Sequence, residues 1–187
     1  LRETAHQQSR GPALAGKVIV INPARGGSNY GIEANGVKES EITYDIATRV
    51  EGRLLALGAS VFLTRGPQND PTEFERINLT NSTNADLMIS LNCDGYKNEK
   101  AHGVATYSYG SDAHGVHSVV GDRFASLVQR EICARTDLQD CRTHSKTWDL
   151  LRLVAAPAVR IDLGYLTNPG DAKRYSGAEF RDLIAES

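Results

Sequence analysis

Two hydrophobic patterns alternate along the chain, and together they predict a sheet covered by helices. Short apolar runs, typical of buried strands, lie at 18–21, 60–64, 86–91, 104–108, 150–153 and 158–162. Apolar residues at helical spacing predict helices over 42–57, 72–82 and 116–132, and a final helix from about residue 178. Because strands alternate with helices, we expect an α/β fold with a mostly parallel central sheet of about five to six strands, flanked by helices.

The beginning of the chain follows neither pattern. Residues 1–15 carry Gln, Ser, Gly and Pro without periodicity, and we interpret them as a linker or tail from a missing upstream region. Residues 16–187 are predicted to form one domain, because 187 residues suit a single hydrophobic core. The chain starts with Leu1 rather than Met, and its last predicted helix runs close to Ser187, so we expect the native protein to extend beyond both.

Composition and charge exclude several classes of function. The chain has 21 Lys and Arg against 23 Asp and Glu, so it lacks the basic field that nucleic-acid binding needs. No apolar run approaches the roughly 20 residues of a membrane span, and we expect none. Three cysteines are too few for a disulfide scaffold, and spacing does not decide whether Cys133 and Cys141 pair. Composition and charge do not identify a specific function, so the evidence for one must come from sequence motifs.

Polar residues follow three of the predicted strands. The segments are Asn-Pro-Ala-Arg-Gly-Gly at 22–27, Asn-Cys-Asp-Gly at 92–95 and Asp-Leu-Gly-Tyr at 162–165. In α/β folds with parallel sheets, the ligand site lies beyond the carboxyl ends of the strands. These three segments therefore form the candidate site.

The segments around the strand ends, taken in order, resemble a known family. The matching segments are 18–23, 36–39, 62–65, 75–76, 85–91 and 163–169. From about Lys17 to its end, the chain resembles the zinc-dependent N-acetylmuramoyl-L-alanine amidases of family 3, which cut the amide bond between sugar and peptide in peptidoglycan. The resemblance implies the phosphorylase/hydrolase-like α/β fold of that family.

The catalytic residues of that family do not carry over with the fold. The resemblance implies His, Glu and His as zinc ligands, and these positions hold Arg25, Glu39 and Asn92. The general-base Glu of the family corresponds to Asp162, which is one methylene shorter. A guanidinium has no lone pair for a metal, and an amide oxygen is a weak zinc donor. Because catalytic zinc needs about three protein ligands, we expect no metal, no other cofactor and no catalytic residue.

Loss of the metal would leave two carboxylates, Glu39 and Asp162, without a cation between them. We hypothesise that Arg25 replaces the zinc charge and donates charge-assisted hydrogen bonds to both carboxylates. The alternative is that Arg25 points into water.

A rebuilt metal site, and with it an active amidase, is a further alternative. His114 and His117 would share a helix face at a spacing of three, although a solvated helix start explains them more simply. His144 lies near a late strand and could border the site. Cys93 follows Asn92 in a predicted strand, so its side chain is expected to face away from the site.

A second resemblance bears on the biological role. The segments 141–152 and 157–160 are similar to those of actinobacterial amidase-like proteins. This implies a cytoplasmic, non-catalytic regulator of peptidoglycan precursor synthesis that contacts an enolpyruvyl transferase of the MurA type, under the control of a Ser/Thr kinase. The alternatives are a non-catalytic binder of peptidoglycan fragments and, if a native signal peptide precedes the chain, an exported protein. The sequence identifies neither the partner surface, the phosphorylated residue nor the oligomeric state.

Overall fold

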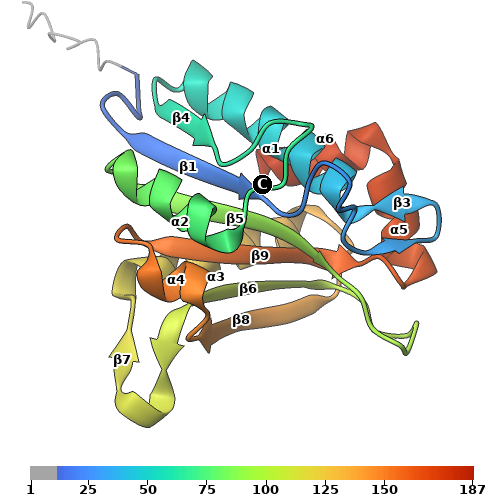
Figure 1. Ribbon diagram of the computed structural model, residues 1–187. Coiled ribbons are helices and arrows are strands. Elements are labelled where there is room, and N and C mark those ends of the chain that lie inside the picture. The colour runs from blue at the N-terminus through green and yellow to red at the C-terminus, as the bar shows by residue number, and fades with distance from the viewer. Residues whose placement is uncertain (1–11) are drawn as a thin grey trace, which may run out of the picture.

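A seven-stranded sheet forms the centre of the protein in the computed structural model, which describes residues 12–187 (Figure 1). The strands are β1 (Val18–Pro23), β4 (Ser60–Leu63), β5 (Leu87–Asp94), β6 (Val104–Ser111), β7 (Val116–His117), β8 (Asp140–Lys146) and β9 (Ala158–Tyr165). Their order is β4-β1-β5-β9-β6-β7, and β8 pairs with β6. The pairs β4–β1, β1–β5, β5–β9 and β6–β8 are parallel, whereas β6 runs antiparallel to β9 and β7. The prediction of an α/β fold with a mostly parallel sheet is confirmed.

Helices cover both faces of this sheet. They are α1 (Glu39–Ala56), α2 (Glu73–Ser82), α3 (Val119–Arg135), α4 (Asp149–Leu153), α5 (Pro169–Ser176) and α6 (Ala178–Glu186), with a 3-10 helix at Asp112–His114. A ribbon of β2 (Glu33–Ala34) and β3 (Val37–Lys38) precedes α1. Helices α2 and α4 pack on one face, and α1, α3, α5 and α6 on the other (Figure 1).

Each face has its own apolar core. The larger core lies under α1, α3, α5 and α6 and includes Ile21 of β1, Leu91 of β5 and Leu163 of β9. The smaller core lies under α2 and α4 and includes Val20 and Met88 from the same strands. Because alternate residues of a strand point to opposite faces, one strand supplies side chains to both cores.

Local hydrogen bonds determine where two of the helices begin. Thr72 precedes α2 and forms a capping box with Glu75, whose carboxylate accepts from the Thr72 N–H at 2.7 Å. Ser118 caps α3 by accepting from the Gly121 N–H at 3.1 Å. Helix α3 therefore begins three residues later than the apolar spacing predicts, and Val116 belongs to β7 instead.

The prediction of a strand at 150–153 is wrong. These residues lie in helix α4, in which the N–H groups of Leu151 and Arg152 donate to the Trp148 carbonyl at 3.0 and 2.9 Å. Leu150 and Leu151 are both buried in the smaller core, whereas consecutive residues of a strand would point to opposite faces. A short apolar run fits either kind of element, so the sequence pattern alone does not separate them.

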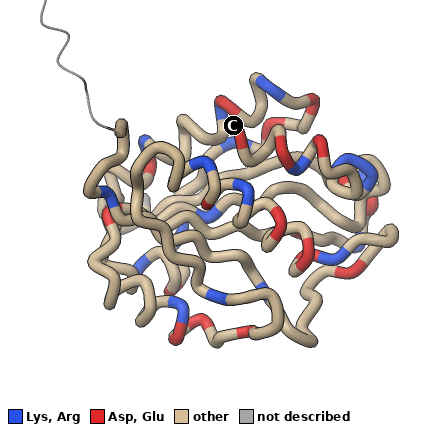
Figure 2. Tube along the Cα trace, turned by 90° about the horizontal axis from the view of Figure 1, so that it is seen from above, with Lys and Arg blue, Asp and Glu red and all other residues tan. Residues whose placement is uncertain are grey.

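Strand β8 and helix α5 were not predicted. Strand β8 has the sequence Asp-Cys-Arg-Thr-His-Ser-Lys, which contains no apolar run because, among residues 12–187, the strand pairs on one side only and is nowhere fully buried. Most of the segment 1–15, interpreted as a linker, lies outside the described residues. In the described part of the chain, no helix has both the length and the apolar character to cross a membrane. Figure 2 shows basic and acidic residues interspersed along the same part.

Candidate functional site

The sheet face under α2 and α4 changes from apolar to polar along its central strands. The successive residues on this face are Val20 and Asn22 in β1, Met88 and Ser90 in β5, and Ala158 and Arg160 in β9. The pairing register places Asn22 beside Ser90, and Ser90 beside Arg160. A row of polar side chains therefore crosses the carboxyl half of the sheet, where the sequence predicts a site.

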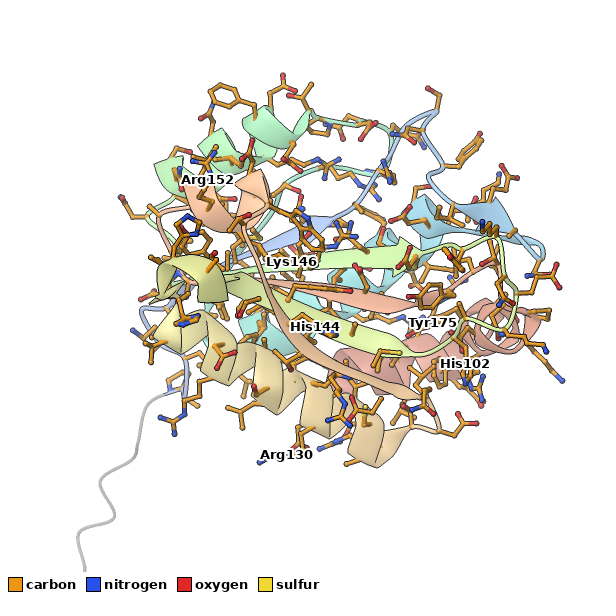
Figure 3. All side chains as sticks on the ribbon, turned by 90° about the horizontal axis from the view of Figure 1, so that it is seen from below. His102, Arg130, His144, Lys146, Arg152 and Tyr175 are labelled. Carbon is orange, nitrogen blue, oxygen red and sulfur yellow. The ribbon has the colours of Figure 1, made fainter. Side chains whose placement is uncertain are left out.

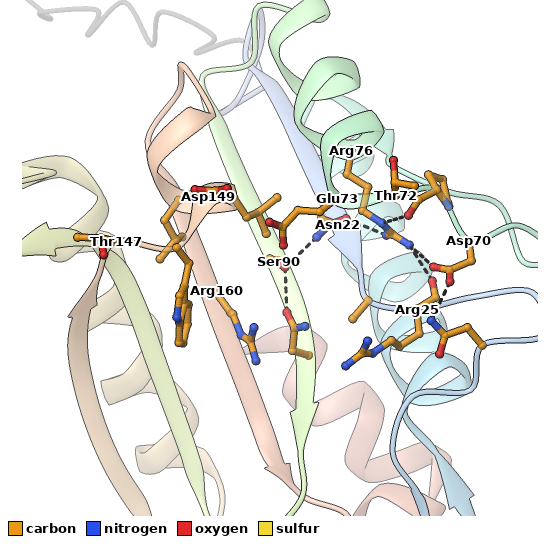
Figure 4. A pocket seen from close by; sticks show the side chains of 17 residues that line it. Asn22, Arg25, Asp70, Thr72, Glu73, Arg76, Ser90, Thr147, Asp149 and Arg160 are labelled. Carbon is orange, nitrogen blue, oxygen red and sulfur yellow. Dashed lines mark hydrogen bonds and ion pairs between the residues drawn. The ribbon is translucent and has the colours of Figure 1, made fainter.

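A cleft of about 730 Å³ lies over this row (Figure 4). It is lined by Asn22, Ala24, Arg25, Asn29, Asp70, Pro71, Thr72, Glu73, Arg76, Ser90, Asn92, Thr147, Trp148, Asp149, Leu150, Leu151 and Arg160. Arg25 and Asn92, two of the candidate residues, are among them. The volume suits a small ligand.

The loop after β1, which carries Arg25, is held by two buried arginines. Arg76 donates to the carbonyls of Pro23 at 2.8 Å and of Arg25 at 2.9 Å. Arg65 donates to the carbonyls of Pro23 at 3.0 Å and Ala24 at 3.1 Å, and its burial lowers its pKa to about 10. Arg25 itself adopts the left-handed backbone conformation, with φ +62°. These hydrogen bonds satisfy the loop carbonyls and fix the position of Arg25.

Glu39, at the start of α1, has a buried carboxylate with three hydrogen-bond donors. Its side chain is 1% exposed, and Oε2 accepts from Arg25 Nε at 3.2 Å and from the Ile32 N–H at 3.1 Å. Oε1 accepts from the Cys93 N–H at 3.1 Å. Gly31 is needed here, because its φ is +67° and a Cβ would come within 2.6 Å of Arg25 Cγ and also meet Glu39 Oε2. The Glu39 charge is thus neutralised by protein groups.

Asp162 has a different cationic partner. Arg160, two residues earlier on the same face of β9, donates from Nε at 2.6 Å and from Nη2 at 3.2 Å to the two carboxylate oxygens. Burial raises the pKa of the Asp162 carboxyl, against the opposing effect of the hydrogen bonds from Arg160. The pKa of Arg160 is also raised, because its bonds to Asp162 offset its burial. Because the Arg160 guanidinium stays protonated, a change in the charge of this pair can come only from protonation of the Asp162 carboxylate.

Trp148, after β8, packs against Arg160 from the other side. The Arg160 guanidinium carbon lies 4.7 Å from the centre of the Trp148 indole ring. The centre of the Tyr107 ring lies 4.8 Å from the centre of the indole, and the two rings are tilted by 48°. His144 of β8, which is labelled in Figure 3, stacks on Tyr107 with the two ring centres 5.5 Å apart. Arg160 is therefore held between a carboxylate and an aromatic ring.

The hypothesis that Arg25 contacts both carboxylates is correct for Glu39 only. Arg25 forms an ion pair with Glu39, whereas the hydrogen bonds of Asp162 come from Arg160. The sequence interpretation missed Arg160 and Trp148. The signal for Arg160 was its spacing of two from Asp162, which places both side chains on one face of a strand. Contact with Trp148 depends on long-range pairing that spacing does not reveal.

Asn92 ends a short hydrogen-bonded row on the sheet. Its Oδ1 accepts from Ser90 Oγ at 2.9 Å, and Ser90 Oγ accepts in turn from Asn22 Nδ2 at 2.9 Å. Cys93 lies in the larger core on the opposite face, as expected, and burial raises the pKa of its thiol well above the usual value.

The donor set in the cleft does not fit a zinc ion. Arg25 offers no lone pair, the Asn92 oxygen is engaged by Ser90, and the oxygens of Glu39 already accept three hydrogen bonds. Within residues 12–187, no group of three or more His, Cys, Asp or Glu side chains is arranged to hold a metal. His114 lies in the 3-10 helix and His117 in β7, so they do not share a helix face.

Cys133 and Cys141, whose pairing the sequence does not decide, are both free thiols in the structure. Burial raises the pKa of each thiol. Neither lines the cleft.

Comparisons with solved structures identify the fold. AmiC2 of Nostoc punctiforme, named as an N-acetylmuramoyl-L-alanine amidase, superposes with a TM-score of 0.84 at 24% identity, covering 92% of this chain and 93% of that one. The amidase Ami1 of Mycobacterium smegmatis superposes with a TM-score of 0.79 at 21% identity, covering 92% and 93% of the two chains. At these identities the likeness concerns the fold.

Sequence comparisons identify the family. The chain is 43% identical to the protein named N-acetylmuramoyl-L-alanine amidase CwlM of Mycobacterium tuberculosis, over 100% of this chain and 47% of that protein. It is 28% identical to the amidase LytC of Bacillus subtilis, over 93% of this chain and 34% of LytC. The chain thus spans less than half the length of these two relatives. A family model described as N-acetylmuramoyl-L-alanine amidase matches residues 19–187. The chain therefore belongs to the N-acetylmuramoyl-L-alanine amidase family.

Proposed function

We propose that this chain is a non-catalytic member of its family, a pseudo-amidase without a zinc site. The observation that carries the proposal is the ion pair between Arg25 and the buried carboxylate of Glu39. Glu39 is the one family ligand retained in the sequence, and here it receives a guanidinium. A bound dication would have to displace Arg25 and would face its positive charge.

The other residues of the cleft support the same proposal. Activation of water by zinc requires an open coordination position held by about three protein ligands. Arg25 and Asn92 supply neither imidazole nor carboxylate, and Asp162 is engaged by Arg160 at 2.6 Å. A carboxylate held in this way is not free to act as a general base on water.

The role that we propose is regulation of peptidoglycan precursor synthesis through contact with another protein. The partner is an enolpyruvyl transferase of the MurA type, and a Ser/Thr kinase controls the contact, in the cytoplasm. The support is the resemblance of residues 141–152 and 157–160 to actinobacterial amidase-like regulators, and the 43% identity to CwlM. Residues 141–146 belong to β8, an edge strand with one pairing partner, and such an edge is accessible to another protein.

Two alternatives can be tested beside this role. A binder of peptidoglycan fragments is favoured by the size of the cleft and by Trp148, which is partly exposed on its wall. An active amidase is what the names of the relatives suggest.

One set of experiments separates the three. The chain is mixed with a purified transferase of the MurA type and, separately, with insoluble peptidoglycan, and bound protein is measured by co-sedimentation and calorimetry. Amidase activity is measured with zinc present, beside the triple variant Arg25→His/Asn92→His/Asp162→Glu and the same triple variant with Glu39→Gln as its inactive control. The proposal predicts binding to the transferase and no amide cleavage by the wild-type chain. Cleavage by the wild-type chain, or binding to peptidoglycan alone, would overturn it.

A further inference from the structure

We propose that the cleft binds an oxyanion, the carboxylate or phosphate group of a small ligand, between Arg25, Asn92 and Arg160. The inference goes beyond the proposed regulatory role. It shares one premise with that role, namely that Arg25 and not a metal ion contacts Glu39.

Arg25 supplies the first donors. Its Nε donates to Glu39, which fixes the orientation of the guanidinium plane. Its Nη1 and Nη2 groups make no hydrogen bond to the described residues, and the side chain lines the cleft while 47% exposed. The outer edge of the guanidinium therefore faces the cleft with its N–H groups available.

Arg160 supplies donors from the facing wall. Its Nε and Nη2 are engaged by Asp162, and Trp148 packs against the guanidinium plane at 4.7 Å. The Nη1 group has no partner among residues 12–187, and this side chain also lines the cleft. Figure 4 shows Arg25 on one side of the cleft and Arg160 on the other, with both guanidinium groups toward the same end.

Asn92 lies on the strand between these two arginines. Strand β5 pairs with β1, which leads into the Arg25 loop, and with β9, which carries Arg160. The Oδ1 atom of Asn92 accepts from Ser90, and its Nδ2 group makes no hydrogen bond to the part of the chain that the structure describes. An amide N–H donor is thus placed between two guanidinium groups.

The chemistry of these donors selects an oxyanion. Two guanidinium groups and an amide N–H offer donors only, in the planar arrangement that matches carboxylate and phosphate oxygens. Each guanidinium is already held by a buried carboxylate, so little side-chain freedom is lost when an anion binds. Because these carboxylates also offset the positive charge, we expect the affinity to depend more on directed hydrogen bonds than on net charge, and to decrease only weakly with salt.

The charge of the cleft differs between its two ends. Three carboxylates line the cleft: Asp70 is paired with Arg76 at 2.9 Å, and Glu73 and Asp149 lie at the end away from the two guanidinium groups (Figure 4). Carboxylates repel an anion, so the charged group of a ligand is directed toward Arg25 and Arg160. At about 730 Å³ the cleft has room for the rest of a small molecule as well as its anionic group.

The test is a titration followed by NMR. The ¹⁵N-labelled chain is titrated at constant ionic strength with inorganic phosphate in one series and with succinate in another, and the side-chain N–H signals of Arg25, Arg160 and Asn92 are followed. Saturable shifts of these signals are expected in at least one series. Saturation by phosphate alone identifies a phosphate ligand, and saturation by succinate alone a carboxylate ligand. No saturable shift in either series would overturn the proposal.

Variants show whether these three residues form the site. Arg160→Gln and Asn92→Asp should each weaken binding about tenfold or more, because each removes a donor to a charged group. Asn92→Asp is included because Arg160→Gln leaves the buried Asp162 unpaired and affects folding as well. Arg130→Gln, on helix α3 (Figure 3), is the matched control and should bind like the wild-type chain. Equal affinity in all four proteins would contradict the site.

The zinc content of the same samples separates this proposal from the proposed function. Zinc in the wild-type chain would refute the shared premise. A zinc-free chain without saturable shifts would refute the anion site alone and leave the pseudo-amidase proposal standing.

Discussion

The two faces of the central sheet differ in what their carboxyl ends carry. On the face under α1 and α3, strand β9 stays apolar along its length, with Val159, Ile161 and Leu163 all buried in the larger core. On the opposite face the same strand begins with buried Ala158 and continues with Arg160 and Asp162. One set of alternate residues in this strand therefore packs in the larger core, whereas the other set brings Arg160 to the cleft and Asp162 beside it as its partner.

The comparison shows which kind of contact holds each face of the sheet. The apolar face depends on buried area and close packing, and truncation of a single side chain removes part of that area and leaves a cavity. The polar face depends on a few hydrogen-bonded ion pairs near solvent. The two residues of such a pair can be replaced together. Arg25 with Glu39, and Arg160 with Asp162, are two such pairs. At these positions the fold requires that each buried carboxylate has a partner.

The largest expected effect lies on the apolar face. Leu163→Ala should lower the free energy of unfolding by about 2–5 kcal/mol, because Leu163 is fully buried and its truncation leaves a cavity. Chemical denaturation followed by circular dichroism measures this difference. Leu55→Ala is the control, since Leu55 is 51% exposed on α1 and should change stability by no more than about 0.5 kcal/mol. Similar losses at both positions would contradict the comparison.

A smaller effect is expected behind the cleft, at Gly31. Gly31→Ala should lower the free energy of unfolding by about 2 kcal/mol. An alanine backbone is strained at the positive φ of this position, and its Cβ would lie against Arg25 and Glu39. Gly36→Ala has a similar φ of +77° and no atom within 4 Å of the added Cβ, so it isolates the backbone contribution. If the two variants unfold at the same temperature, contact with the ion pair is not what requires glycine at position 31.

The ion pair itself should contribute less. Arg25→Ala should lower the free energy of unfolding by about 1.5 kcal/mol, because the buried Glu39 carboxylate loses a charged donor but keeps two backbone N–H groups. The change is measured as a lower melting temperature. Arg130→Ala removes an exposed ion pair with Glu131 and should have almost no effect. An unchanged melting temperature for Arg25→Ala would mean that Arg25 does not replace a cation at this site.

The smallest effect is expected far from the cleft, between α1 and α6. Hydrogen bonds from Arg53 and Arg49 lower the pKa of Asp182. A carboxyl group whose pKa is lowered by folding stabilises the protein above its unfolded pKa, near 4, and this contribution is lost as the pH falls through the folded value. Asp182→Asn should therefore slightly lower the melting temperature at neutral pH and leave it unchanged in strong acid. A difference that persists in acid would contradict an electrostatic origin.

The sequence predicts the apolar half of this comparison better than the polar half. The runs at 18–21 and 86–91 indicate β1 and β5 directly, because fully buried strands need continuous apolar sequence. The apolar pattern does not indicate β8, because β8 is a polar edge strand, and it does not distinguish α4 from a strand, because both kinds of element bury short apolar runs.

The candidate site divides in the same way. The pairing of Arg25 with Glu39 follows from placing one positive side chain beside a position that the sequence resemblance implies to be a ligand of a cation. The assignment of Asp162 to Arg160, and the packing of Trp148 on Arg160, depend on side-chain contacts within and across strands. Such contacts depend on the register of β9 and on the position of the segment after β8, which local sequence does not encode.

The central claim is that the cleft lost its metal through two positions. The direct test is the zinc content of the purified chain after dialysis, measured by elemental analysis beside the Arg25→His/Asn92→His double variant. The account predicts almost no zinc in the wild-type chain and about one zinc ion per chain in the variant, where Glu39 and two imidazoles restore three ligands. About one zinc ion per wild-type chain would contradict it.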